Sequence, residues 1–459
     1  MTNASTISTV ANAPALRLSS ASVHWKLLAA VAACVVPAMG LVGIGLPYAG
    51  AVFVVVALMF VLGYQIITQD HEGFLCIGIG VIPALILLRG LFVYNSCIIV
   101  LGTGIVLWLT QAPEEVRGIW RDRVLKWFFL LALLYWWLSY LNTGEYANNL
   151  RLVELVLSAA AVMLLGRRRS YLATAFIGVA ISTIAVGAGM LPNSTLRLGA
   201  AEIDGVNLGN PIQLGVPSVL VLILSLSDRG QWMFLGRRIW WRIGLALVAG
   251  EWLILSGSRG AWLSALGVLV LMGVFNRQDR RILLMLGAAI VLITGAAMST
   301  PLGEQIARQY EKTLDTDRTL ANRTSGRSAQ WAAIPDAVAQ SPIWGWGPGT
   351  GRNVVAYYTG RHLNWHSLYL QIAAETGLIG VTALAFLLVA ISRRALQQWR
   401  EFGEMAPILA LIAYFSIGFS VSAYDANCGL FIGLAMLGGE TVLRYQITRV
   451  TINAPGYQS

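Results

Sequence analysis

The chemistry that this sequence predicts rests on three basic residues that lie far apart along the chain, His366, Arg259 and Arg197. A histidine has an unperturbed pKa of about 6.5, so its neutral imidazole can accept a proton from an attacking hydroxyl group. An arginine guanidinium can bind phosphate oxygens through two parallel hydrogen bonds. One base and two phosphate-binding cations suit a displacement in which a hydroxyl attacks and a diphosphate leaves.

Each of these residues also has a structural interpretation. His366 can cap a helix at the membrane interface and take no part in chemistry, and Arg259 and Arg197 can be arginines that reach from the membrane edge into water. Glu375 is the carboxylate nearest to His366 in sequence, but it lies nine residues further on. At about 100° per residue this places it on the opposite side of a helix. A structural role for Glu375 beside Gly377 is therefore favoured over an acid–base pair with His366.

The elements that must position these residues are transmembrane helices. The chain of 459 residues is 57% hydrophobic and 12% charged, with a mean hydropathy of +0.67. Soluble domains carry about 25% charged residues. Many apolar runs have the length of about 17–25 residues that crosses a bilayer, whereas a transmembrane β-barrel would show short alternating segments. The sequence predicts an all-α, polytopic transmembrane helical protein with about 12–14 spans and one large, partly helical outward loop.

The charges and the cysteines argue against two other kinds of function. The net charge is +10, but no soluble basic domain or basic tract with interleaved aromatic residues is present, so nucleic-acid binding is not expected. The four cysteines lie in or beside apolar runs without metal-ligand spacing, and they are interpreted as small buried hydrophobic residues: Cys34, Cys76, Cys97 and Cys428. The tripeptide Asp315-Thr316-Asp317 resembles the metal-binding motif of nucleotide-sugar transferases, but three residues are a weak signal, and no metal or cofactor is expected.

The distribution of arginine predicts which loops share a membrane face. Lys and Arg concentrate in cytoplasmic loops. This rule places the arginine-dense loops in the cytoplasm, together with both termini: 112–126, 166–170, 227–242, 276–281 and 393–400. The alternate loops then face outward: 191–210, the turn at Arg259, 300–365, and the turn at Tyr424–Asn427. Arg197 and Arg259 are exceptions on the arginine-poor side, and charges near a membrane are usually retained for a function or a partner.

The long outward loop is expected to contain structure of its own. A first amphipathic helix is expected over 303–314, and a second over 328–338 with an interruption at Pro335. The run 343–351, IWGWGPGTG, predicts a tight glycine-rich bend close to the membrane surface rather than a nucleotide site.

Three further residues are candidates for substrate binding. Arg323 and Arg327 in the long loop can extend the cationic surface, although ordinary solvated charges explain them equally well. Asp425, in an outward turn between two late spans, can orient His366 or a substrate.

The chain divides accordingly into five regions. Residues 1–26 form a cytoplasmic N-terminal tail, 27–299 a transmembrane helical region, 300–365 the large outward loop, 366–443 the C-terminal transmembrane helices, and 444–459 a cytoplasmic tail. Within these regions single spans are expected, for example, at 74–90 and 377–391.

Three stretches resemble the bacterial O-antigen ligase family, within the superfamily that includes O-antigen polymerases and protein O-oligosaccharyltransferases. They are SGSRGAWL at 256–263, GWGPG at 345–349, and NWHS at 364–367 with ETGLIG at 375–380. Arg197, before Gly209-Asn210-Pro211, matches the family's first arginine less closely. The layout of spans with one large loop in the C-terminal third extends the resemblance over most of the chain.

The resemblance implies a multi-pass enzyme of the bacterial inner membrane whose active site faces the periplasm. The implied donor is an undecaprenyl-diphosphate-linked O-antigen glycan, and the implied acceptor is a sugar hydroxyl of lipid A–core. The reaction in this family is regarded as metal-independent and inverting. By the same resemblance, Arg197 and Arg259 hold the diphosphate and stabilise its leaving charge, and His366 acts as base or orients the acceptor hydroxyl.

Other functions remain open at this point. A polymerase or a protein O-oligosaccharyltransferase uses the same class of donor and differs only in the acceptor. A transporter or flippase for the lipid-linked sugar would place its polar groups near the bilayer midplane, often within internal repeats, whereas these charges gather at one face. A structural scaffold would not explain the histidine and the arginines together.

Overall fold

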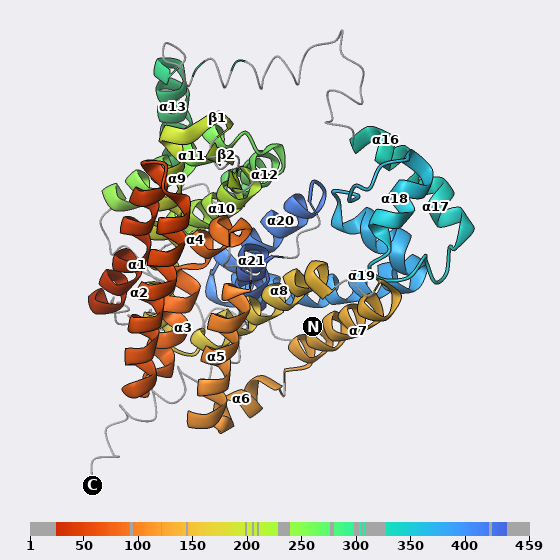
Figure 1. Cartoon of the computed structure of the whole chain (residues 1–459), viewed down its shortest axis with the longest axis horizontal. Coiled ribbons are helices and arrows are strands. Elements are labelled where there is room, and N and C mark those ends of the chain that lie inside the picture. The colour runs from red at the N-terminus through yellow and green to blue at the C-terminus, as the bar shows by residue number, and fades with distance from the viewer. Residues whose placement is uncertain are drawn as a thin grey trace, which may run out of the picture.

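The fold was analysed in a computed structural model (Figure 1). It describes residues 24–91, 95–120, 122–143, 146–197, 200–203, 206–208, 211–227, 239–275, 280–297, 303, 307, 327–421 and 425–437. The expected helix over 303–314 and the tripeptide Asp315-Thr316-Asp317 therefore lie outside the described residues, apart from two isolated positions.

Helices make up nearly all of the described chain. In the first half they are α1 Trp25–Gly43, α2 Pro47–Ile67, α3 His71–Gly80, α4 Ile82–Leu87, the 3-10 turn η1 Leu88–Gly90, α5 Ser96–Gln111, α6 Pro113–Trp120, α7 Arg123–Thr143, α8 Tyr146–Leu165, α9 Arg169–Met190 and η2 Leu191–Asn193. In the second half they are α10 Pro211–Ser227, α11 Ile239–Ser256, α12 Arg259–Phe275, α13 Arg280–Ala297, α16 Arg327–Ala332, α17 Ile334–Gln340, α18 Gly351–Thr359, α19 Leu368–Phe402, α20 Ala406–Gly418 and α21 Ala426–Met436.

The helices confirm the predicted fold class, an all-α multi-pass membrane protein. Among the described residues, α1, α2, α7, α9 and α19 are long and apolar enough to cross a membrane. The helices α5, α10, α12, α20 and α21 are also apolar but shorter. Helices are the natural solution in lipid because they satisfy every backbone polar group within the segment. The central helices pack closely. The most extensive contacts join α8 to α21, α1 to α9 and α10 to α11.

One expected span is broken. The single helix expected over 74–90 is divided into α3, α4 and η1, and Val81 ends α3 and begins α4. Pro83 lies in the first turn of α4. A proline has no N–H to continue the helical hydrogen bonds, but it is well tolerated in a first turn, so the apolar run forms two short helices.

A small antiparallel sheet occupies the stretch that was expected to be only a polar loop, 191–210. Its strands are β1 Ser194–Arg197, β2 Ala200–Ile203 and β3 Val206–Leu208, in the order β1-β2-β3. Arg197 pairs with Ala200, and Glu202 pairs with Asn207. The sequence contains a strong signal for this hairpin, the dipeptide Asp204-Gly205 between β2 and β3, although the polarity of the stretch predicted only a loop.

Helix α19 and the elements packed on it form a lobe beside the main bundle, at the right of Figure 1. The expected span 377–391 is the middle of this longer helix, which is kinked at Gly377 (φ 57°, ψ −154°). Helix α7 packs along α19, and α17 and α18 contact its N-terminal part. The second expected loop helix, 328–338, is present as α16 and α17, which separate at Ala333 just before Pro335.

Ion pairs gather several arginine-dense loops at one end of the molecule. Arg168 binds Glu72 (2.5 Å) and Glu115 (2.9 Å), which joins the loops 166–170 and 112–126. Arg394 binds Asp122, which joins the C-terminal part of α19 to the same loop. We call this surface the basic end. The grouping agrees with the predicted topology, in which these loops share one membrane face.

Candidate active site

The glycine-rich run 343–351 forms the predicted tight bend, and it closes around the kink in α19. Gly345 has φ 68°, and a Cβ at this position would lie 2.4 Å from the carbonyl carbon of Glu375. The backbone N–H groups of Trp346 and Gly347 donate to the carbonyls of Ala374 (2.9 Å) and Glu375 (2.8 Å). On the other side of the kink, Leu378 N donates to Pro342 O (2.8 Å). The bend therefore satisfies backbone groups that the kink at Gly377 leaves outside the helical pattern.

The Glu375 side chain locks this arrangement. Its carboxylate is completely buried and accepts hydrogen bonds from the backbone N–H of Gly349 (2.7 Å) and Gly351 (3.0 Å). It also accepts one from the Gln371 amide (3.0 Å) and one from the Tyr135 hydroxyl on α7. Glu375 thus joins helix α7, the glycine-rich bend and α19. The favoured structural interpretation of this residue agrees with these contacts.

His366 lies where this lobe turns into α19. Its backbone is in the left-handed region, with φ 51°, which is uncommon for a residue other than glycine. The carbonyl of the buried Trp365 accepts a hydrogen bond from Trp331 Nε1 (3.0 Å), and Leu368 N donates to Val421 O (3.1 Å). The N-cap of α19 is Ser367 and not His366. The backbone at His366 is therefore held by its neighbours on both sides, and the capping interpretation does not account for this residue.

Two features of the surroundings keep the imidazole neutral. Partial burial lowers the pKa of His366 below its usual value of 6.5, and the positive charge of Arg327 lowers it further. Both effects disfavour the protonated form. The structure thus brings Arg327, at the start of α16, within electrostatic reach of His366, whereas Arg323 lies outside the described residues.

Arg259 is the first residue of α12, directly after a tight turn. Gly257 adopts φ 59°, and Ser258 N donates to Ser256 Oγ (3.2 Å). Trp262 Nε1 donates to Leu253 O (2.7 Å), which fixes the end of α11 to the start of α12. The first N–H groups of a helix have no partner within it, so an arginine at this position adds its charge to a natural anion-binding end.

His366 and Arg259 approach the same short segment, Ser420–Val421, which follows α20. A Cβ on Gly260 would lie 1.7 Å from Ser420 Oγ, so the backbone beside Arg259 is in direct contact with Ser420. The next residue, Val421, accepts the hydrogen bond from Leu368 N, two residues after His366. The chain on both sides of this 107-residue separation is therefore in contact with the same two-residue segment.

The third predicted residue, Arg197, ends strand β1, and its side chain is outside the described part of the structure. The sheet leads into α10, which packs against α12. A Cβ on Gly215 of α10 would lie 3.1 Å from Ser256 Oγ and 3.2 Å from Ser258 Cβ. The element that carries Arg197 is thus connected, through the first turns of α10, to the turn before Arg259.

Asp425, a candidate for orienting His366 or a substrate, lies at the start of helix α21. Its carboxylate accepts a hydrogen bond from Cys428 N (2.9 Å) and so caps helix α21. No hydrogen bond joins Asp425 to His366 in the described part of the chain. It lies instead within electrostatic reach of Glu154, which forms a buried ion pair with Arg89.

The Arg89–Glu154 pair was missed in the sequence. Arg89 ends the apolar run that forms α3 and α4, and Glu154 lies inside the apolar helix α8. Single charges of opposite sign within apolar runs are a signal for pairing, because a lone charge in a membrane protein is costly. Both side chains are more than 90% buried.

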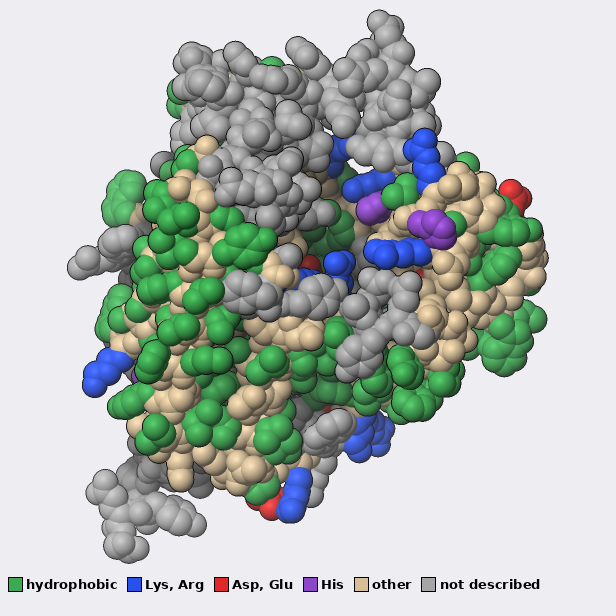
Figure 2. Space-filling view, viewed as in Figure 1, with side chains coloured by type: hydrophobic (Ala, Val, Ile, Leu, Met, Phe, Trp, Pro, Cys, Tyr) green, Lys and Arg blue, Asp and Glu red, His purple; other side chains and the backbone are tan. Residues whose placement is uncertain are grey.

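Figure 2 shows how basic side chains gather on the surface of the molecule. Lys and Arg side chains, together with histidine, surround a hollow between the main bundle and the lobe of α16–α19. An open hollow lined by cations attracts an anionic substrate.

Comparisons with known proteins point to the same part of the chain. Residues 244–385 match the family model described as O-antigen ligase. The chain is also 30% identical, over 173 residues, to the O-antigen ligase of Salmonella typhimurium (strain LT2). That alignment covers 34% of this chain and 41% of the relative, which is less than two thirds of the relative's length.

The matched segment contains Arg259, Arg327, His366 and the glycine-rich bend, whereas Arg197 and Asp425 lie outside it. The segment thus includes both residues whose chain neighbours contact Ser420–Val421. This chain is therefore a multi-pass membrane protein in which residues 244–385 are similar to the O-antigen ligase family.

Proposed function

We propose that this protein is an O-antigen ligase of the bacterial inner membrane. It transfers a glycan from undecaprenyl diphosphate to a sugar hydroxyl of lipid A–core, in an active site that faces the periplasm. The observation that carries the proposal is that the chain next to His366 and the chain next to Arg259 both contact Ser420–Val421, and that both residues lie in the segment that matches the family.

In the proposed reaction, His366 accepts the proton of the acceptor hydroxyl. The hydroxyl oxygen forms a bond to the anomeric carbon of the donor, and the bond from that carbon to the diphosphate oxygen breaks with inversion. The electron pair leaves with undecaprenyl diphosphate. Its negative charge is stabilised by Arg259 and the first N–H groups of α12, and Arg197 adds a second cation. Partial burial, with a contribution from the charge of Arg327, lowers the pKa of His366 and so keeps the imidazole neutral and ready to accept the proton.

The donor's lipid chain has a suitable surface that begins at Arg259. Helix α12 exposes an apolar stripe of residues spaced three to four apart: Leu263, Leu266, Val270 and Val274. Such a stripe faces the hydrocarbon of the bilayer. We place the polyprenyl chain along this stripe, with its diphosphate at the N-terminus of the same helix.

The proposed topology follows the distribution of charges. The basic end lies in the cytoplasm with the tails 1–26 and 444–459, and the loop 300–365 and the hollow lie in the periplasm. A hydrophobic donor that is anchored in the membrane then presents its diphosphate sugar at the outer interface, where α12 begins.

The test uses full-length protein in detergent with an undecaprenyl-diphosphate glycan and purified lipid A–core. Transfer to the core is expected with wild-type protein, also in the presence of EDTA. His366→Ala should reduce the rate by about 10²–10⁴-fold, the usual contribution of a general base. Arg259→Ala and Arg197→Ala should each reduce it by about 10²–10³-fold, the scale for removing one charge-stabilising group.

Arg400 is an exposed arginine in the last turn of α19, at the basic end. Arg400→Ala is therefore the matched control and should leave the rate unchanged. Failure of wild-type protein to modify the core, with formation of longer glycans or of a glycosylated peptide, would assign the chain to the polymerase or the protein O-oligosaccharyltransferase branch. An unchanged rate in His366→Ala would reject His366 as the general base.

A further inference from the structure

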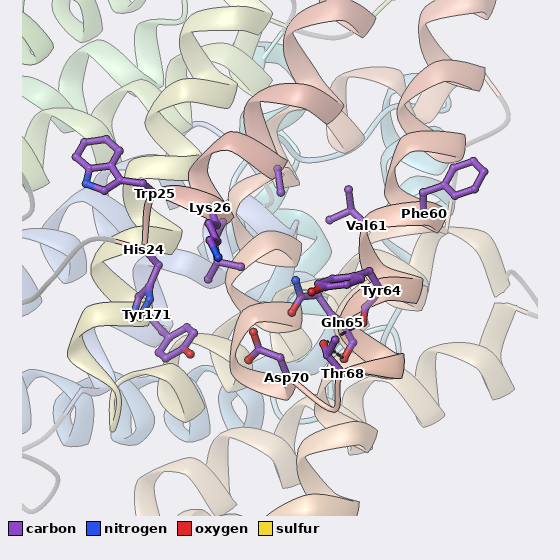
Figure 3. Close-up of a pocket in the computed structure, with 12 residues that line it drawn as sticks. His24, Trp25, Lys26, Phe60, Val61, Tyr64, Gln65, Thr68, Asp70 and Tyr171 are labelled. Atoms are coloured by element: carbon purple, nitrogen blue, oxygen red, sulfur yellow. Dashed lines mark hydrogen bonds between the residues drawn. The ribbon is translucent and has the colours of Figure 1, made fainter.

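A second cavity lies at the opposite end of α1 from the sheet that carries Arg197 (Figure 3). The start of α1 meets the start of α9, where the ring of His24 stacks on Tyr171 with centroids 4.2 Å apart. Helix α1 also contacts η2, which leads into the sheet. With a rise of 1.5 Å per residue, the 19 residues of α1 separate the two ends by about 28 Å. The cavity of about 750 Å³ is thus a separate feature from the candidate active site.

The polar side of this cavity presents two oxygen acceptors close together. Gln65 is 7% exposed, and its Oε1 has no hydrogen-bond partner within the described chain. The Asp70 carboxylate, which caps α3 through Gly73 N (2.8 Å), lies beside it. An Asp70 carboxylate oxygen and Gln65 Oε1 lie 2.2 Å and 2.8 Å from the position that a Cβ on Gly73 would take. A buried amide oxygen next to a carboxylate calls for a cationic N–H donor.

A cation faces these acceptors across the cavity. Lys26, in the first turn of α1, is one of the lining residues and carries an ammonium group that suits an anionic oxygen. In Figure 3 the side chains of Lys26 and of Gln65 come from different helices, on either side of the cavity. The two kinds of charge are thus separated, with acceptors on one wall and a donor on the other.

The remaining wall is apolar and continues onto the outer surface of two membrane-spanning helices. Leu27 and Ala30 come from α1, and Phe60 and Val61 come from α2. Phe60 is 74% exposed, and both helices are long and apolar enough to cross the bilayer. The cavity therefore lies at the polar ends of two spans and opens toward hydrocarbon, where a lipid head group meets its chains.

We propose that this cavity binds a phospholipid whose head group carries a phosphate and a primary ammonium, that is, an ethanolamine phospholipid. The ammonium donates hydrogen bonds to Gln65 Oε1 and the Asp70 carboxylate, and Lys26 contacts the phosphate. The acyl chains lie along Phe60 and Val61. A choline head group has the same charges but no N–H to donate, and a glycerol head group lacks the cation, so both satisfy the site less well. This site is independent of the function proposed above.

Native mass spectrometry of the full-length protein in detergent tests the proposal with three lipids of identical acyl chains, which carry ethanolamine, choline or glycerol head groups. Wild-type protein should retain one ethanolamine lipid with an affinity about tenfold higher than for either of the others. Gln65→Leu keeps the volume but removes one of the two acceptors, so it should reduce the preference for ethanolamine over choline. Lys26→Gln should weaken binding of all three lipids.

Lys126→Gln, which changes an exposed lysine on α7, is the matched control and should bind as wild type does. Thermal unfolding without added lipid shows whether each variant is folded. Equal binding of the three lipids by wild-type protein, or an undiminished ethanolamine preference in folded Gln65→Leu, would overturn the proposal.

Discussion

The left-handed backbone at His366 carries an energetic cost that the surrounding contacts must offset. A residue other than glycine in this region costs about 1–2 kcal/mol. The conformation is imposed by the hydrogen bonds at Trp365 and Leu368, which hold the chain before and after it. Strain of this kind is often found at functional sites, where a side chain must point in one direction. Replacement by glycine would relieve the strain and remove the base, so stability and activity should separate at this residue.

The protonation state of His366 predicts how activity and stability depend on pH. Its folded pKa is lowered below 6.5, so the folded protein binds fewer protons than the unfolded chain as the pH falls below that value. The contribution of His366 to stability is thus present above about pH 6.5 and is lost as the pH falls through the folded pKa. The transfer rate should be level near neutral pH and decrease with acidification, because the protonated imidazole cannot act as a base.

Removal of the charge on Arg327 should shift the pH at which the transfer rate falls on acidification. Arg327→Gln raises the pKa of His366, so the rate is expected to begin falling at a higher pH than in wild-type protein, whereas Arg327→Lys keeps the charge and the wild-type profile. Initial rates measured between pH 4.5 and pH 8 in one mixed buffer would show the difference. Superimposable profiles for wild type and Arg327→Gln would mean that this arginine does not act on His366.

At the scale of the elements, the position of Arg259 depends on how closely α12 approaches the end of α20. Gly260→Ala places a methyl group 1.7 Å from Ser420 Oγ and must separate the two elements. A shift of about 1 Å in a site can reduce the rate by about 100-fold. Ser420→Gly creates the missing space, so the double variant should recover most of the activity. Rates for the two single variants and the double variant give the coupling, and independent effects would argue against a role for this contact.

The kink in α19 should be equally intolerant of a side chain. Gly377→Ala combines a backbone conformation closed to alanine with a Cβ 2.6 Å from the carbonyl carbon of Ile343, so destabilisation of at least about 3 kcal/mol is expected. Gly360→Ala is the matched control, because Gly360 has φ 69° and no atom within 4 Å of its Cβ position. It should cost about 1 kcal/mol. Tryptophan fluorescence during thermal unfolding measures both, and similar midpoints would show that the bend adapts.

The helical fold class could be predicted from the sequence, and so could the arginines on the face where the positive-inside rule expects few cations. Arg259 stood out because the arginine-poor face predicts none, and the glycine-rich bend was evident from its composition. The contacts of Glu375 could not be predicted, because its partner Tyr135 is 240 residues away and nothing local marks the pair. The buried partners Arg89 and Glu154 belong to the same class. Long-range pairing decides these details, and it leaves little trace in a single sequence.

At the scale of the whole molecule, the structure separates two faces that can be labelled independently. The four cysteines are buried, so a single introduced cysteine reports on its own position. His362→Cys lies on an exposed residue of the lobe, and Arg117→Cys lies on an exposed residue at the basic end. A membrane-impermeant maleimide should label the first in intact spheroplasts and the second only after permeabilisation. The reverse result would invert the proposed topology and remove the candidate site from the periplasm.

The carboxylate that joins α7, the glycine-rich bend and α19 also has a consequence for biosynthesis. Tyr135 leaves the ribosome long before Glu375, and helix α8 likewise precedes its main partner α21 by more than 260 residues. Helix α7 is therefore synthesised well before its partner Glu375 is available. The proposed active site, which includes contacts with Ser420 and Val421, forms only after these residues have been synthesised, so a shorter nascent chain is not expected to act on the lipid-linked donor.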